Sequence, residues 1–81
     1  MSQDDARNAL SRANGRVIQS THHVWAAQAV LDQAEKDGDP FEIRHAQNAL
    51  LEADQEHDRS IREQAAAESA LVAAAHADGE L

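Results

Sequence analysis

The 81-residue sequence has no cysteine and no tyrosine, and it has only one tryptophan, one phenylalanine, one proline and three glycines. Without cysteine there is no disulfide framework and no thiolate chemistry. The sequence contains neither a Gly-x-Ser-x-Gly elbow nor a glycine-rich phosphate loop, so nucleophilic catalysis and nucleotide chemistry have no support. We therefore expect a protein that is not an enzyme and that needs no cofactor.

Long apolar stretches are also missing. The longest apolar run, residues 70–75, is far too short to cross a bilayer. The chain starts with the acidic segment 1–5, and no apolar stretch follows it as it would in a secretory signal. These features predict a protein that does not associate with membranes. We expect it in the cytoplasm, or within a virion if it is a phage component.

What the sequence does have is a seven-residue repeat of two small or apolar positions, which we call the seam. Such a repeat lets one helix lie along another. The phrase Ala-x-Asn-Ala-Leu-x-x-Ala, found at residues 6–13 and again at 46–53, is part of it. The seam residues are Ala6, Leu10, Ala13, Val17, Ser20, Val24, Ala27, Leu31 and Ala34 in the first half, and Ile43, Ala46, Leu50, Ala53, His57, Ser60, Gln64, Ala67, Leu71 and Ala74 in the second.

Residues 37–42, Asp-Gly-Asp-Pro-Phe-Glu, contain the signals that end one helix and begin the next. Gly38 suits the left-handed position that closes a helix. Asp39 is a good N-cap, Pro40 fits the first helical turn, and Glu42 is placed to complete a capping box. Stop and start signals this close leave a turn of two or three residues, which forces the two helices to run antiparallel.

We predict one all-α domain over residues 1–81, with a helix at about 4–37, a turn at about 37–39 and a helix at about 40–77. Ser2 is placed to cap the first helix, and Asp78-Gly79 to close the second. The predicted architecture is an antiparallel two-helix hairpin with a coiled-coil-like, alanine-rich seam.

The pair Asn14-Gly15 is the weak point of this prediction. It is a turn signal, and glycine costs about 1 kcal/mol relative to alanine inside a helix. The heptad nevertheless runs through the pair without a skip, and Gly15 falls on the side away from the seam. We expect an unbroken or mildly bent first helix. The alternative is a three-helix bundle with a break at Asn14-Gly15.

Folding the chain about the turn places large seam residues opposite small ones, as in the predicted pair of Leu31 and Ala46. This arrangement fills space and lets the helices approach closely. The middle of the seam is polar instead, and Ser20 is predicted to face His57. Polar seam residues lower stability but can fix register. Alternatively, His57 is a pH-responsive element, because imidazole changes charge near neutrality.

Several large apolar residues lie beside the seam rather than in it. Ile18 and Trp25 do so in the first helix, and Leu51 and Ile61 in the second. So small a protein would not normally leave such side chains exposed. We predict that they form an association surface, most simply in a homodimer that makes a four-helix bundle. In the alternative, Trp25 folds over the hairpin's own edge or packs on a short third helix.

The formal net charge is −8, and it is unevenly distributed. Residues 6–31 contain three arginines and no carboxylate, whereas residues 32–58 contain nine carboxylates and two basic residues. Such a field repels nucleic acid and attracts basic protein surfaces. We therefore expect a basic protein partner and no direct binding of nucleic acid; the alternative is a solvated, solubilising face. The residues predicted to carry electrostatic docking are Glu52, Asp54, Glu56 and Asp58.

Five histidines and 15 carboxylates raise the question of a metal site. Glu42 and His45 have the Glu-x-x-His spacing that di-iron helical bundles use. Such a site needs two of these motifs and two further glutamates, and the first helix offers no glutamate before Glu35. We therefore assign no metal ligands, and a metal-binding bundle remains an alternative.

Together these features predict a small, acidic, non-enzymatic protein–protein interaction module. It would act by self-association and through an acidic and apolar docking surface. One alternative is a structural or accessory subunit of a larger assembly, such as a phage or virion component. Another is an inhibitor that mimics nucleic acid.

Overall fold

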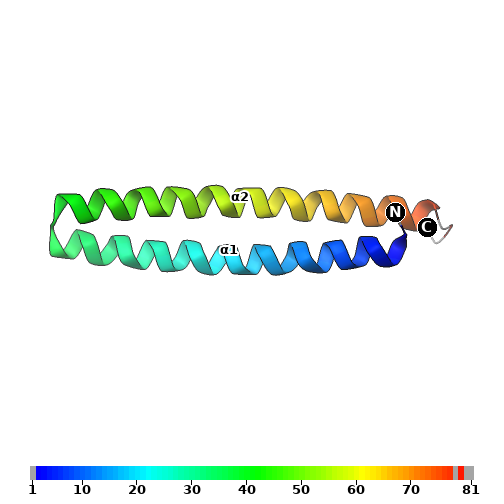
Figure 1. The fold of residues 1–81 in the computed structure, drawn as a ribbon, viewed down its shortest axis with the longest axis horizontal. Coiled ribbons are helices and arrows are strands. Elements are labelled where there is room, and N and C mark those ends of the chain that lie inside the picture. Colours follow the sequence, from blue (N-terminus) through cyan, green and yellow to red (C-terminus); the bar gives the residue numbers. More distant parts are fainter. Residues whose placement is uncertain (1, 78, 80–81) are drawn as a thin grey trace.

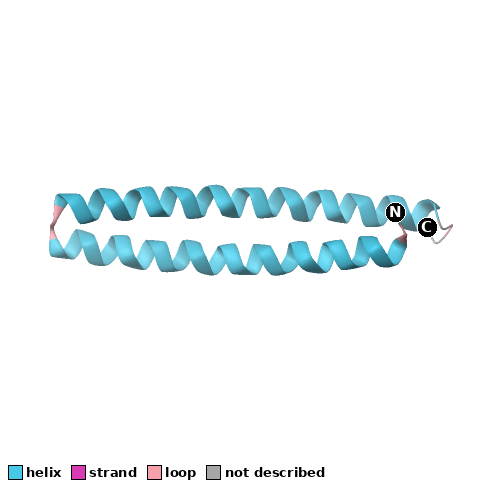
Figure 2. Ribbon diagram, viewed as in Figure 1, coloured by secondary structure: helices cyan, strands magenta, loops and turns pink. Residues whose placement is uncertain are grey.

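The computed structural model of the protein describes residues 2–77 and 79, which form two long helices joined by a short turn (Figure 1). Helix α1 spans Gln3–Asp37 and helix α2 spans Pro40–Ala77. They lie side by side and antiparallel in a hairpin of 60 × 15 × 13 Å. Helix makes up almost all of the described chain (Figure 2). The predicted all-α hairpin is confirmed, and the helix bounds agree with the predicted ones to within one residue.

Three predicted caps are present at the helix ends. The Ser2 hydroxyl accepts a hydrogen bond from the Asp5 backbone N–H at 3.2 Å. Gly38 closes α1 in the left-handed conformation, with φ of 76°, and its N–H donates to the Ala34 carbonyl at 2.9 Å. Asp39 begins α2 by accepting from the Phe41 N–H at 2.9 Å. These caps satisfy backbone groups that the helix ends leave unpaired.

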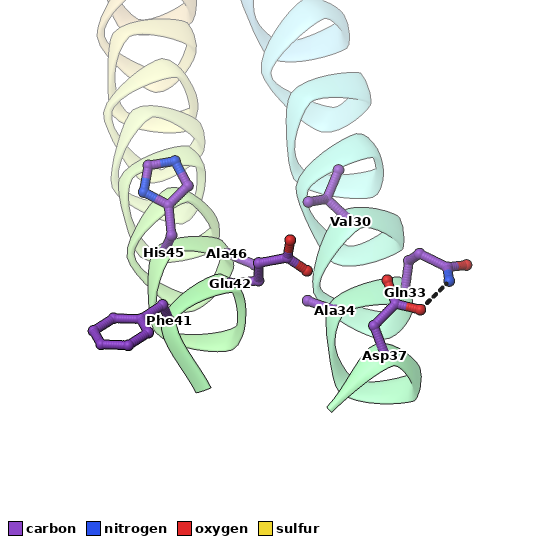
Figure 3. Close-up of a pocket in the computed structure, with 8 residues that line it drawn as sticks. All are labelled: Val30, Gln33, Ala34, Asp37, Phe41, Glu42, His45 and Ala46. Atoms are coloured by element: carbon purple, nitrogen blue, oxygen red, sulfur yellow. Dashed lines mark hydrogen bonds between the residues drawn. The ribbon is translucent and has the colours of Figure 1, made fainter. Parts of the chain in front are cut away.

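Two other end signals have different outcomes. The Glu42 side chain makes no hydrogen bond to any residue that the structure describes, so the predicted capping box does not form. Its carboxylate points across to α1 instead (Figure 3). After α2, Gly79 has a φ of 75° and donates to the His76 carbonyl at 3.1 Å. Asp78, the other member of the predicted closing pair, lies outside the described residues.

Helix α1 runs through Asn14-Gly15 without a break, so the three-helix alternative is wrong. The seam holds the helix on either side of this point, because Ala13 is only 1% exposed and Val17 is half-buried. Gly15 itself is exposed, in line with its predicted place away from the seam. The heptad therefore prevails over the local turn signal.

The core of the hairpin is thin. Its largest fully buried side chain is that of Ser20, and an apolar cluster of Leu31, Ala34 and Ala46 lies near the turn. Small seam residues remove little area from water, so each helix keeps most of its surface exposed. The buried seam residues are Ala6, Ala13, Ser20, Leu31, Ala34, Ala46, Ala53, Ser60 and Ala74.

The middle of the seam is polar, as predicted. Ser20 Oγ lies 2.9 Å from His57 Nδ1, which joins the two helices. Nearer the open end of the hairpin, opposite the turn, Arg16 Nε donates to Glu63 Oε2 at 2.7 Å. These contacts fix which residues of α1 lie level with which residues of α2.

Candidate functional site

The large apolar residues predicted to form an association surface are exposed on the single hairpin. Trp25 is 67% and Ile18 60% exposed on α1, whereas Leu51 is 56% and Ile61 44% exposed on α2. Residues of these types are usually found largely inside proteins. We call these four residues the apolar flank.

All four residues of the apolar flank lie on one side of the hairpin. Ile18 and Trp25 each follow directly after a seam valine, and Leu51 and Ile61 each follow directly after a seam residue of α2. In two antiparallel helices, residues that follow seam positions project to the same side of the pair. The exposed Val72 also follows a seam position and extends this side toward the open end.

The apolar flank is arranged in two levels along the hairpin. The contact between Ser20 and His57 fixes the alignment of the helices. With this alignment, the two isoleucines of the flank lie at one level. Trp25 and Leu51 lie at a second level closer to the turn, by seven residues on α1 and ten on α2, or about 10–15 Å along the axis. Each level therefore presents one large side chain from each helix.

Trp25 does not cover the hairpin's own edge, which removes that alternative. Its ring contacts His22 of the same helix, with 5.7 Å between the ring centroids. The residue is otherwise largely open to solvent, with 67% of its surface exposed. Within the described residues there is also no third helix on which it could pack.

The four acidic residues predicted for docking are all exposed, but they do not form one patch. They are spaced two residues apart, and each step of two residues is a rotation of about 200° around the helix axis. Successive members of the set therefore project to nearly opposite sides. Glu56 lies on the side opposite the apolar flank, where its Oε2 is 3.4 Å from His23 Nδ1. Asp54 and Asp58 follow seam positions and lie on the apolar-flank side, between its two levels. Glu52 faces outward from α2.

A groove beside the turn, which we call the tip groove, was not found by the sequence reasoning. It has a volume of about 430 Å³ and lies on the side opposite the apolar flank, since Val30 and Glu42 each precede a seam position. Val30 and Phe41 are 59% and 86% exposed beside it. The signal for it was Phe41, a large apolar residue with no place in the seam. Its lining residues are Val30, Gln33, Ala34, Asp37, Phe41, Glu42, His45 and Ala46 (Figure 3).

The tip groove combines an apolar floor with two carboxylates. The seam residues Ala34 and Ala46 form its base. Asp37 accepts a hydrogen bond from Gln33 Nε2 at 3.0 Å. The Glu42 carboxylate extends into the space between the helices (Figure 3) and has no hydrogen-bond or ion-pair partner among the described residues. The groove is therefore apolar at its base and negative at its rim.

The Glu-x-x-His pair identified in the sequence, Glu42 and His45, lines this groove from one helix. Within residues 2–77 and 79, however, no three His, Asp or Glu side chains come together in a way that would hold a metal ion. Neither described helix contains a stretch apolar and long enough to cross a membrane.

Comparison of the chain with protein-family models, with curated proteins and with solved structures gives no match.

Proposed function

We propose that the protein is a non-enzymatic protein–protein interaction module that self-associates through its apolar flank. The observation that carries this proposal is the pairing of exposed side chains at two levels on one side of the hairpin. Trp25 and Leu51 lie at one level and Ile18 and Ile61 at the other, so each level has one exposed apolar residue on each helix. A second hairpin laid on this side would turn two helices into a four-helix bundle.

The same side of the hairpin is suited to a second copy of itself. Its two apolar levels lie at similar distances on either side of Thr21. A second copy could therefore lie with its turn beside the turn of the first or at the opposite end. In both orientations the apolar levels of the two copies would meet. Charges of both signs occur at both ends of this side. Arg7 and Glu68 follow seam positions near the open end, and Asp32, Glu35 and Arg44 do so near the turn. Because each end carries charges of both signs, the two copies can place opposite charges near one another in either orientation.

The expected strength of this association is moderate. Full burial of a large apolar side chain contributes about 1.5–3 kcal/mol. Four half-exposed side chains from each of two copies are therefore enough to offset an association cost that starts at about 4 kcal/mol. Asp54 and Asp58 oppose association, because they lie between the apolar levels and lose hydration there. We expect a dimer that forms in the micromolar range.

A second candidate function is that of an accessory subunit in a larger assembly. The observation that favours it is the presence of exposed apolar residues on the other side as well, where Val30 and Phe41 stand beside the tip groove. A dimer formed through the apolar flank leaves these residues uncovered. A further protein would cover them.

Replacing Trp25 by glutamate tests the proposed function. In sedimentation velocity, we expect the wild-type protein to be dimeric at tens of micromolar and the Trp25→Glu variant to be monomeric. The circular dichroism of the variant should remain helical, because Trp25 is 67% exposed and does not belong to the hairpin's core. Glu52→Gln, on the outward face of α2, is the control and should leave the dimer intact. A Trp25→Glu variant that remains dimeric would contradict the proposal.

A further inference from the structure

The geometry points to a second binding site: the tip groove takes a short peptide segment of a partner protein, in which an apolar side chain lies next to a lysine or arginine. This inference goes beyond self-association and names a different partner on a different side of the molecule. It is linked to the proposed function in one respect. The protein bound in the groove would be the basic partner that the negative charge of the chain favours.

The base of the groove is suited to an apolar side chain. Ala34 and Ala46 belong to the same buried cluster, one on each helix, and their side chains are single methyl groups. Val30 stands above them on α1, and Phe41 borders the groove on α2 (Figure 3). A space of about 430 Å³ accommodates one or two large side chains, and filling it would cover apolar surface that water now contacts.

The rim of the groove has exposed carboxylates that a cation from outside the hairpin could pair with. Glu42 has no partner among the described residues, and Asp37 receives only the neutral amide of Gln33. The basic residues closest in sequence, Lys36 and Arg44, do not line the groove. Arg44 follows a seam position and so projects on the opposite side of the hairpin. A lysine or arginine beside Glu42 would add a charge-assisted hydrogen bond where the low exposure of the groove base reduces screening.

The same residues favour a cationic ligand over an anionic one. Two carboxylates at the rim repel phosphate, nucleic acid and acidic peptides. Of the groove's lining residues, His45 is the one that carries positive charge, and it does so when protonated. The groove also lies away from the apolar flank, so it stays open when two hairpins associate through that flank. Each copy in a dimer would then bind one peptide segment.

The test uses a synthetic peptide of leucine and lysine, and the same peptide with glutamate in place of lysine. Isothermal titration calorimetry measures affinity, and NMR shifts of the Ala34 and Ala46 methyl groups report the place of binding. We expect the lysine peptide to bind and to shift both methyl groups, and the glutamate peptide not to bind. Binding of both peptides alike would overturn the charge argument.

Two variants separate the groove from the general acidic field of the protein. Glu42→Gln should weaken binding of the lysine peptide severalfold, because it removes a charge-assisted contact at an exposed rim. Glu52→Gln removes the same charge from a residue outside the groove and should change the affinity by less than about twofold. Phe41→Ala, at an exposed position where folding does not depend on the ring, should also weaken binding severalfold.

Equal losses in Glu42→Gln and Glu52→Gln, or no binding of the lysine peptide to the wild-type protein, would overturn the inference. These results are distinguishable from failure of self-association, because sedimentation of the same samples reports the dimer separately. A monomeric protein that binds the lysine peptide in the groove would contradict the proposed self-association alone. A dimer that does not bind it would contradict the groove alone.

Discussion

The Ser20 hydroxyl and the His57 ring meet at the centre of the seam, with 2.9 Å between Oγ and Nδ1. Ser20 has a single hydroxyl proton, which it donates to the Val17 carbonyl at 3.0 Å. The Val17 carbonyl can only accept, so we infer that His57 Nδ1 donates in the bond between the helices. That bond makes no demand on Nε2, so it forms with a neutral or a charged ring. The polar centre thus fixes register, and this bond gives no support to the pH-responsive interpretation of His57.

Substitutions at this pair test the direction of the hydrogen bond. Ser20→Ala leaves the His57 N–H without its partner in a half-buried place, and should lower the free energy of unfolding by about 1–2 kcal/mol. His57→Leu leaves Ser20 bonded to the Val17 carbonyl and adds apolar surface, so it should cost less or stabilise the hairpin. Urea unfolding measures both. A greater loss in His57→Leu than in Ser20→Ala would contradict the assigned donor.

The glycines at residues 15 and 38 should respond in opposite directions to alanine. At Gly15 an added Cβ meets no atom within 4 Å and the backbone is helical, so Gly15→Ala should raise stability by about 1 kcal/mol. At Gly38 the φ of 76° strains any residue with a Cβ, so Gly38→Ala should lower it by about 1 kcal/mol. Thermal unfolding at one protein concentration measures both. A loss in Gly15→Ala would show that the helix is broken there in solution.

Substitutions at two leucines should distinguish a residue that stabilises the hairpin from a residue that stabilises the dimer. Leu31 is 8% exposed and belongs to the apolar cluster near the turn, so Leu31→Ala should destabilise the hairpin by about 2–3 kcal/mol. Leu51 is 56% exposed on the apolar flank, so Leu51→Ala should change the stability of dilute protein little and weaken the dimer severalfold. Urea unfolding in dilute protein and sedimentation at higher concentration measure the two effects. Equal destabilisation in dilute protein would place Leu51 in the core.

Neutralising the carboxylates between the apolar levels should strengthen self-association. Asp58→Asn removes a charge that loses hydration when the flank is covered, so the dimer should form at several-fold lower concentration. The double variant Asp54→Asn/Asp58→Asn should lower the dissociation constant of the dimer further. Glu52→Gln, which changes the net charge equally on the outward face, should leave the dissociation constant nearly unchanged. Equal effects of Asp58→Asn and Glu52→Gln would mean that overall charge, and not this surface, controls association.

Most of the fold could be predicted from the sequence because few alternatives satisfy its pattern. The heptad determines which side of each helix is covered, and the signals from Gly38 to Pro40 leave room only for a tight turn. The same pattern also places the apolar flank, since Ile18 and Trp25 repeat at seven residues beside the seam. These features depend on local spacing alone.

The tip groove could not be predicted in the same way. It depends on the direction that the Glu42 side chain takes, and local rules favoured a capping box that the structure does not contain. It also depends on how closely α1 and α2 approach beside the turn, where Leu31, Ala34 and Ala46 pack together. The predicted acidic docking residues show a related limit. Asp54 and Glu56 are close in sequence, but on a helix they point to different sides.

Sedimentation equilibrium of the wild-type protein over a dilution series, from about one to several hundred micromolar, tests self-association most directly. The chain has a mass of 8.8 kDa. The proposed flank-to-flank association predicts that the measured mass rises with concentration from that of one chain to that of two copies. A mass of one chain across the whole series would contradict it.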